Sequence, residues 1–246
     1  MHVSSRCGAT VALAVSSLLL VSACNGGTDG PGASGAKASG SPAAPPEHIS
    51  SAQAEQALVT GDALAKGWQR EPDTILDTTE AGSEKDLLKG VREGCGPLAE
   101  VVNTGRPGAD HKATAQAVFY KKGEETNLGQ DVSGYTRAEA TKLMDDLRKA
   151  VKDCASFDGT MDGEKATVKV TVLDVPKLGD ESLGYAVRIT YGDLLMDFDM
   201  ATVRSVGGIT TFRNNYSTTG DRAKAAFDKG LARAAEKLQA VTSTTK

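Results

Sequence analysis

The 246-residue sequence has few of the side chains that most catalytic and nucleic-acid-binding sites require. It contains three histidines, one tryptophan and 4% aromatic residues, and its formal net charge is −4. A mildly acidic chain without clustered lysine and arginine is poorly suited to neutralise nucleic-acid phosphates. His48 and His111 lie in proline- or glycine-flanked segments that give a histidine-based catalytic site no rigid support. The composition therefore argues against nucleic-acid binding and against a hydrolase of this type, and no phosphate-binding loop or dinucleotide fingerprint is present.

The amino-terminal segment 1–23 has the organisation of a bacterial export signal. Arg6 precedes an apolar run at 9–20, which is too short to cross a bilayer as a helix. The run ends in Leu-Val-Ser-Ala-Cys at 20–24, which resembles the bacterial lipobox. The resemblance implies that Cys24 receives a diacylglycerol and becomes the first residue after cleavage, so that acyl chains anchor the protein. The alternative is an ordinary secretory signal with a chance cysteine.

Residues 24–48 comprise the lipidated cysteine and a predicted flexible tether. The tether is predicted because the segment is mostly glycine, serine, alanine and proline. Such a segment buries too little apolar surface to offset its ordering entropy. The aromatic residues all lie at or after Trp68, so we expect a single folded domain at 49–246.

Two cysteines, Cys95 and Cys154, remain once Cys7 and Cys24 are assigned to the amino-terminal segment. An even pair in an oxidising compartment indicates a disulfide. The alternatives are two free thiols or a metal site, although two cysteines without a nearby histidine make a poor zinc site.

Alternating apolar and polar residues predict the strands, and apolar residues at helical spacing predict the helices. Strands are expected at 67–76, 113–121, 126–132, 166–172, 183–191, 194–200 and 209–216, with a Gly207-Gly208 hairpin before the last. Helices are expected at 50–58, 97–102, 219–240 and behind the capping box Thr136…Glu139 as far as about Val151. The fold class is α+β, a twisted antiparallel sheet with helices packed on one face.

Asp197 and Asp199 are the most informative polar pair, because residues two apart on a strand face the same way. Paired carboxylates perform acid–base work or hold calcium, but no glycine-containing calcium loop surrounds these two, so no metal and no catalytic residue is assigned. With Lys169, Arg188 and Arg204 they form either a solvated, charge-balanced sheet face or part of a cleft for a polar ligand.

Two further features have both a structural and a functional interpretation. Trp68 belongs either to the core or to a ligand mouth, since tryptophan stacks on sugars. The segment Gly-Asp-Glu-Ser-Leu-Gly at 179–184 lacks the spacing of a nucleophile elbow and is interpreted as a strand-entry turn. The candidate ligand-binding residues are Trp68, Arg188, Asp197 and Asp199.

The order of several short motifs resembles the extracellular sensor domains of the PknH type, which occur in actinobacterial kinases and lipoproteins. The motifs are Asp62-Ala63-Leu64 with Gly67-Trp68, Cys95-Gly96-Pro97-Leu98, Val151-Lys152-Asp153-Cys154, Leu178-Gly179-Asp180-Glu181-Ser182 and Val203-Arg204-Ser205-Val206-Gly207. The resemblance spans most of 50–240 and implies an α+β domain that binds an extracellular ligand in a cleft without catalytic chemistry. This chain departs from the kinases in having no kinase domain, no transmembrane helix and one cysteine pair in the domain.

Together these features predict a membrane-anchored extracytoplasmic lipoprotein with a non-enzymatic binding or sensing domain and no cofactor. Its expected partners are the membrane, through the lipid, and a small molecule, glycan or lipid of the cell envelope. One alternative is a carrier of lipid or lipoglycan. Another is a cell-wall-modifying enzyme that uses Asp197, Asp199, Asp180 or Glu181.

Overall fold

The computed structural model describes residues 48–72, 87–124, 126–216 and 223–244. All of them belong to one compact unit, Ala44–Lys246. The predicted export signal, Cys24 and the predicted tether up to residue 47 lie outside the described residues. The elements in chain order are α1 (Ser51–Gln56), η1 (Gly61–Ala63), β1 (Trp68–Arg70), η2 (Glu93–Cys95), α2 (Gly96–Thr104), β2 (Ala113–Lys121), β3 (Asn127–Gly134), α3 (Arg137–Asp153), β4 (Ser156–Met161), β5 (Glu164–Leu173), β6 (Glu181–Tyr191), β7 (Leu194–Ser205), β8 (Gly208–Tyr216) and α4 (Lys224–Ser243).

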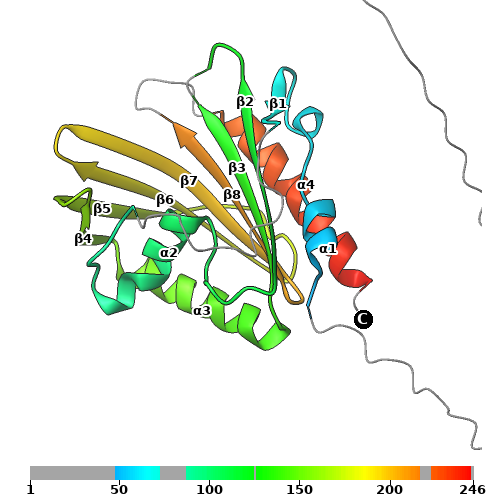
Figure 1. Ribbon diagram of the computed structural model, residues 1–246, viewed down its shortest axis with the longest axis horizontal. Coiled ribbons are helices and arrows are strands. Elements are labelled where there is room, and N and C mark those ends of the chain that lie inside the picture. Colours follow the sequence, from blue (N-terminus) through cyan, green and yellow to red (C-terminus); the bar gives the residue numbers. More distant parts are fainter. Residues whose placement is uncertain (1–47, 73–86, 125, 217–222, 245–246) are drawn as a thin grey trace, which may run out of the picture. The chain divides into compact units, whose positions relative to one another are not determined.

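The strands form one sheet in the order β1-β2-β3-β8-β7-β6-β5-β4, and every neighbouring pair is antiparallel (Figure 1). Strands β4 to β8 follow one another as a meander, and the pairing of β3 with β8 joins this meander to the hairpin of β2 and β3. The α+β class and the antiparallel sheet predicted from the sequence are therefore confirmed. None of the helices in the described ranges combines the length and the apolar run that a bilayer crossing requires.

One surface of the sheet, called here the α4 face, is covered by α1 and α4 over strands β2, β3, β7 and β8. Phe212 of β8 stacks on Phe119 at 6.4 Å between ring centroids and meets Phe227 of α4 at 5.9 Å. Gly230 brings α4 close to the sheet, because a Cβ at this position would lie 2.5 Å from the Phe212 ring. This aromatic contact fixes α4 against the centre of the sheet.

The opposite surface, called the α3 face, is covered by α2 and α3 over strands β4 to β7. Met200 belongs to this cluster together with Leu147 of α3, whereas its neighbour Ala201 belongs to the cluster beneath α4. Successive residues of a strand point to opposite faces, so the two helix pairs lie on opposite sides of the sheet (Figure 1). The expectation that the helices pack on one face is corrected in this respect, because β7 buries apolar residues on both of its faces.

A disulfide joins Cys95 and Cys154, as predicted, with Cα atoms 5.8 Å apart. Cys95 immediately precedes α2 and Cys154 immediately follows α3, so the bond holds these helix ends together on the α3 face. Arg92 reinforces the junction, because its Nη2 donates a hydrogen bond to the Asp153 carbonyl at 2.9 Å.

The capping box predicted at Thr136 and Glu139 begins α3. The Glu139 amide donates to the Thr136 hydroxyl, and the Glu139 carboxylate accepts from the Thr136 amide at 2.8 Å. These bonds satisfy two amides that the first helical turn leaves unpaired. The Thr136 hydrogen bonds lower the pKa of the Glu139 carboxyl below its usual value.

Strand β4 at Ser156–Met161 was not expected from the sequence. Its inward positions are Phe157, Gly159 and Met161, and the central glycine interrupts an apolar alternation that is only three residues long. Leu88 occupies the space that this glycine leaves, since a Cβ there would lie 2.7 Å from its side chain. A distant residue therefore completes the surface of this strand.

Candidate functional site

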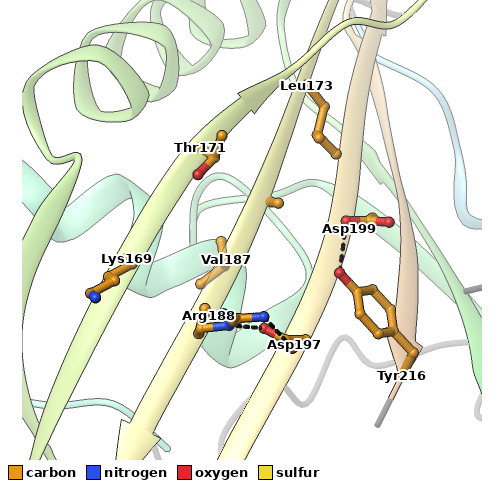
Figure 2. A pocket seen from close by; sticks show the side chains of 9 residues that line it. Lys169, Thr171, Leu173, Val187, Arg188, Asp197, Asp199 and Tyr216 are labelled. Atoms are coloured by element: carbon orange, nitrogen blue, oxygen red, sulfur yellow. Dashed lines mark hydrogen bonds and ion pairs between the residues drawn. The ribbon is translucent and has the colours of Figure 1, made fainter. Parts of the chain in front are cut away.

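A pocket of about 300 Å³ opens on the part of the α4 face formed by strands β5 to β8. Figure 2 shows the labelled residues on the adjacent strands β5 to β8, with the Arg188–Asp197 and Asp199–Tyr216 contacts between them. Its lining residues are Lys169, Thr171, Leu173, Ala186, Val187, Arg188, Asp197, Asp199 and Tyr216. The pocket thus combines charged groups and hydroxyls with an apolar rim.

Arg188 of β6 and Asp197 of β7 form the centre of the pocket. They are direct partners in the ladder, and Arg188 Nε and Nη2 donate hydrogen bonds to the two carboxylate oxygens at 2.7 and 3.0 Å. These hydrogen bonds, followed by the negative charge of Asp197, raise the pKa of the Arg188 guanidinium above its ordinary value. The Asp197 side chain is only 4% exposed, whereas that of Arg188 is 49% exposed. The pair therefore presents its positive partner to the solvent.

A second polar pair lies beside the first. Asp199 projects to the same face as Asp197, and the Tyr216 hydroxyl donates to its carboxylate at 3.2 Å (Figure 2). Tyr216 is the last residue of β8 and lies directly opposite Asp197 in the ladder. The aromatic ring forms one side of the pocket, and its hydroxyl orients Asp199.

Lys169 of β5 is the third charged element of the pocket. It lies directly opposite Arg188 in the ladder, so two cations stand side by side on adjacent strands. Lys169 is exposed and forms no ion pair with any described residue. Like charges directly opposite each other on adjacent strands destabilise a sheet. Asp197 compensates the charge of Arg188 but not that of Lys169.

The connection between β5 and β6 closes one end of the pocket. It crosses the α4 face above Gly184, where a Cβ would lie 2.5 Å from Val175 and 2.8 Å from the Leu173 carbonyl. Val175 and Leu178 then pack against the cluster beneath α4. The glycine is thus required for the chain to cross the sheet and to place Leu173 at the rim.

The structure brings three of the four predicted ligand-binding residues together, namely Arg188, Asp197 and Asp199. Trp68 is 6% exposed and lies in the core cluster beneath α1 and α4, on the edge strand β1. It does not line the pocket. Arg204, which the sequence grouped with the aspartates, points to the opposite face and pairs with Asp180 at 3.1 Å.

Sequence reasoning missed Tyr216, Thr171 and Leu173 as lining residues. The face of Tyr216 could have been predicted from the sequence. Tyr216 and Phe212 are four residues apart on one strand and so point to the same face, and Phe212 points into the core. Thr171 shares its parity with Lys169 on β5. Leu173 ends β5, and no pattern within the strand indicates that the chain turns there across the sheet.

The other polar candidates serve the fold. Gly179 adopts φ +61, and the Asp180 carboxylate accepts a hydrogen bond from the Val206 amide at 2.7 Å. The Ser182 hydroxyl donates to the Pro176 carbonyl at 2.8 Å. The predicted strand-entry turn therefore covers only Gly179 and Asp180, because residues 181–184 already belong to β6. Within the described ranges, no cluster of three or more histidine, cysteine or acidic residues is arranged to hold a metal ion.

The chain therefore contains an α+β domain with a single antiparallel sheet, helices on both faces and a charged pocket on one of them. No known family model and no curated protein sequence matches the chain. The solved extracellular domain of PknH from Mycobacterium tuberculosis has the same fold: its TM-score is 0.51 at 11% identity, and the match covers 76% of this chain and 97% of that domain. A solved uncharacterized protein from Mycobacterium smegmatis is 12% identical, with a TM-score of 0.42 over 75% of this chain and 96% of that one. The resemblance to PknH-type extracellular domains inferred from the sequence is thus confirmed for the fold.

Proposed function

We propose that this chain is a lipid-anchored, extracytoplasmic and non-enzymatic protein that binds a polar saccharide of the cell envelope in the β5–β8 pocket. The observation that carries the proposal is the pocket itself. Arg188, Asp199, Thr171 and Tyr216 supply donors and acceptors on rigid strands, and a small number of placed polar groups with an apolar rim is the usual composition of a small-molecule site. The fold shared with the PknH extracellular domain is consistent with an extracytoplasmic location.

The carboxylates support binding better than catalysis. Both oxygens of Asp197 accept hydrogen bonds from Arg188, and Asp199 accepts one from Tyr216. A general base must have a carboxylate oxygen within reach of the substrate proton, whereas both oxygens of Asp197 and one oxygen of Asp199 are engaged with neighbouring side chains. The arrangement suits hydroxyl recognition by a preformed site.

The position of the pocket relative to the tether supports a ligand outside the bilayer. The chain enters the domain at Ile49, which contacts Gly134 at the end of the sheet where Gly134 pairs with Gly208. Tyr216 lies eight residues further along β8, at the pocket end. At about 3.4 Å per residue, the pocket lies roughly 27 Å from the point where the tether is attached.

The proposal is tested with the lipidated full chain, purified in detergent and applied to an array of cell-envelope saccharides. Arg188→Gln should weaken binding of any retained saccharide by at least about tenfold, the cost of a lost charge-assisted hydrogen bond. Arg233→Gln is the matched control, because Arg233 is 53% exposed and pairs with Glu236 on α4, away from the pocket.

Two results would contradict the proposal. Retention of no saccharide, together with a lipid that co-purifies and is seen by native mass spectrometry, would favour the carrier alternative. Turnover of a saccharide, detected as a change in its mass, would show an enzyme and not a binding protein.

A further inference from the structure

We infer that the pocket selects saccharides that carry an anionic group, with Lys169 as the residue that determines this selectivity. The inference rests on the function proposed above and specifies its ligand. The lining contains two cations and two carboxylates, so its total charge does not predict whether an anionic or a cationic ligand is preferred. The preference depends on which of these charges the solvent can reach.

The accessible charges of the pocket are positive. Lys169 is exposed and Arg188 is 49% exposed, whereas Asp197 is 4% exposed beneath the guanidinium. Asp199 is half-buried and accepts the Tyr216 hydrogen bond. A ligand that enters from the solvent therefore meets the ammonium and guanidinium groups first.

The guanidinium of Arg188 keeps donors for such a ligand. It carries five N–H groups, and its two hydrogen bonds to Asp197 use two of them. Asp197 also fixes the plane of the guanidinium, so the remaining donors are held in place before the ligand arrives. This preorganisation reduces the entropy that binding has to overcome.

Lys169 supplies a charge that no ion pair with a described residue compensates. It stands opposite Arg188 in the ladder (Figure 2), and their mutual repulsion is relieved when an anion lies between them. A carboxylate or phosphate is suited to this place, because it accepts charge-assisted hydrogen bonds from both side chains. Thr171 and the Asp199–Tyr216 pair lie on neighbouring strands and can bind the sugar hydroxyls.

The inference is tested by isothermal titration of the full chain with methyl glucoside, methyl glucuronide, glucose 6-phosphate and glucosamine. Methyl glucuronide or glucose 6-phosphate should bind at least about tenfold more tightly than methyl glucoside. The comparison of these two acidic probes shows whether the site prefers a carboxylate or a phosphate. Glucosamine should bind no better than methyl glucoside.

Lys169→Gln should abolish the preference for the acidic probe, so that its affinity falls to about that of methyl glucoside. The matched control is Lys165→Gln. Lys165 lies on the same strand, is 72% exposed and pairs with Asp158 outside the pocket, so its replacement should leave the preference intact. Circular dichroism of both variants verifies that the fold is retained.

Equal affinities for the acidic and the neutral probe would overturn the inference, and so would a preference for glucosamine. Binding of neutral array saccharides without any binding of the acidic probes would overturn it as well, while the proposed function would stand. If no saccharide binds to the array or in the titrations, both the inference and the proposed function fail.

Discussion

Two tyrosines carry their hydroxyls into the interior of the domain. Tyr185 is fully buried on the α3 face, where its hydroxyl lies 3.3 Å from that of Thr202, and Tyr135 is 1% exposed. Burial raises the pKa of both phenols above the ordinary value of 10. The neutral form of each tyrosine is therefore the form that the folded state favours.

The sign of the resulting pH dependence follows from this direction. Because the folded pKa is raised, the unfolded chain releases these protons first as the pH rises, and stability falls above about pH 10. Tyr185→Phe removes one such group, so the loss of stability above pH 10 should be shallower by about 1.4 kcal/mol per pH unit. Denaturant unfolding from pH 8 to pH 11.5 measures this slope.

Tyr120→Phe is the matched control for Tyr185→Phe. Tyr120 is 40% exposed, and its replacement should leave the alkaline slope unchanged. An identical slope in the wild type and in Tyr185→Phe would show that the buried phenol does not titrate differently in the folded state.

The alternation of side chains along a strand explains how much of the site the sequence reveals. The spacing of Asp197 and Asp199 placed both on one face, and that is where they lie. Tyr191 pairs with Leu194 around a two-residue turn, and this register by itself brings Arg188 opposite Asp197. A hairpin assigned at the Gly192 turn would have predicted this ion pair from the sequence.

The remaining site residues depend on contacts between distant segments. Lys169 pairs with Arg188 across β5 and β6. A long connection joins these two strands, and its length does not predict which residues pair. Trp68 is equally ambiguous, because its burial requires α1 and α4 to be placed first. Strand alternation fixes the face of a residue, but not which helix covers that face.

At the level of elements, the hairpin turn after β7 lies one residue earlier than the predicted Gly207-Gly208 turn. Ser205 pairs with Gly208, so the turn residues are Val206 and Gly207. Val206 adopts φ +54, which a β-branched residue rarely does. Its neighbour has to be glycine, because a Cβ at Gly207 would lie 2.2 Å from the Tyr135 carbonyl. Packing against another element therefore overrides the local turn preference.

The disulfide controls how firmly α2 is attached to the domain. Cys95 and Cys154 are 59 residues apart, and closing a loop of this length stabilises the folded state by roughly 4 kcal/mol on the chain-entropy account. The double variant Cys95→Ala, Cys154→Ala should therefore lose about this free energy of unfolding and roughly 10 °C in Tm. Denaturant and thermal unfolding measure both quantities.

Hydrogen exchange shows where this stability is lost. Amides of α2 should exchange faster in the double variant. Amides of α4 should still exchange only through global unfolding, because α4 packs on the opposite face of the sheet. Both cysteines are almost fully buried, so the double variant is a better test than a reductant. An unchanged Tm in the double variant would refute a stabilising role for the bond.

On the scale of the whole molecule, the amino-terminal end of the folded segment and the pocket lie at separate ends of the described domain. Ile49, where the proposed tether would end, lies beside the sheet end that carries Gly134, whereas Tyr216 marks the pocket end of β8. α4 returns from the pocket end to the tether end, where Thr242 contacts Ser205 through their hydroxyls at 2.8 Å. With the proposed lipid anchor on the amino-terminal side, the pocket would lie at the end of the sheet that is farther from the membrane.

The anchor that we propose is a lipid on Cys24. One acyl chain holds a protein only marginally, whereas two or more anchor it stably, so the loss of the modified cysteine should release the protein from tight membrane association. In cells fed labelled palmitate, Cys24→Ala should incorporate no label and accumulate as the longer precursor, as shown by gel mobility and fluorography. Cys7→Ala is the matched control and should be labelled and processed normally, because Cys7 lies within the export signal. Unchanged labelling of Cys24→Ala would refute lipidation at this residue, and it would leave the binding domain without the attachment on which its proposed location depends.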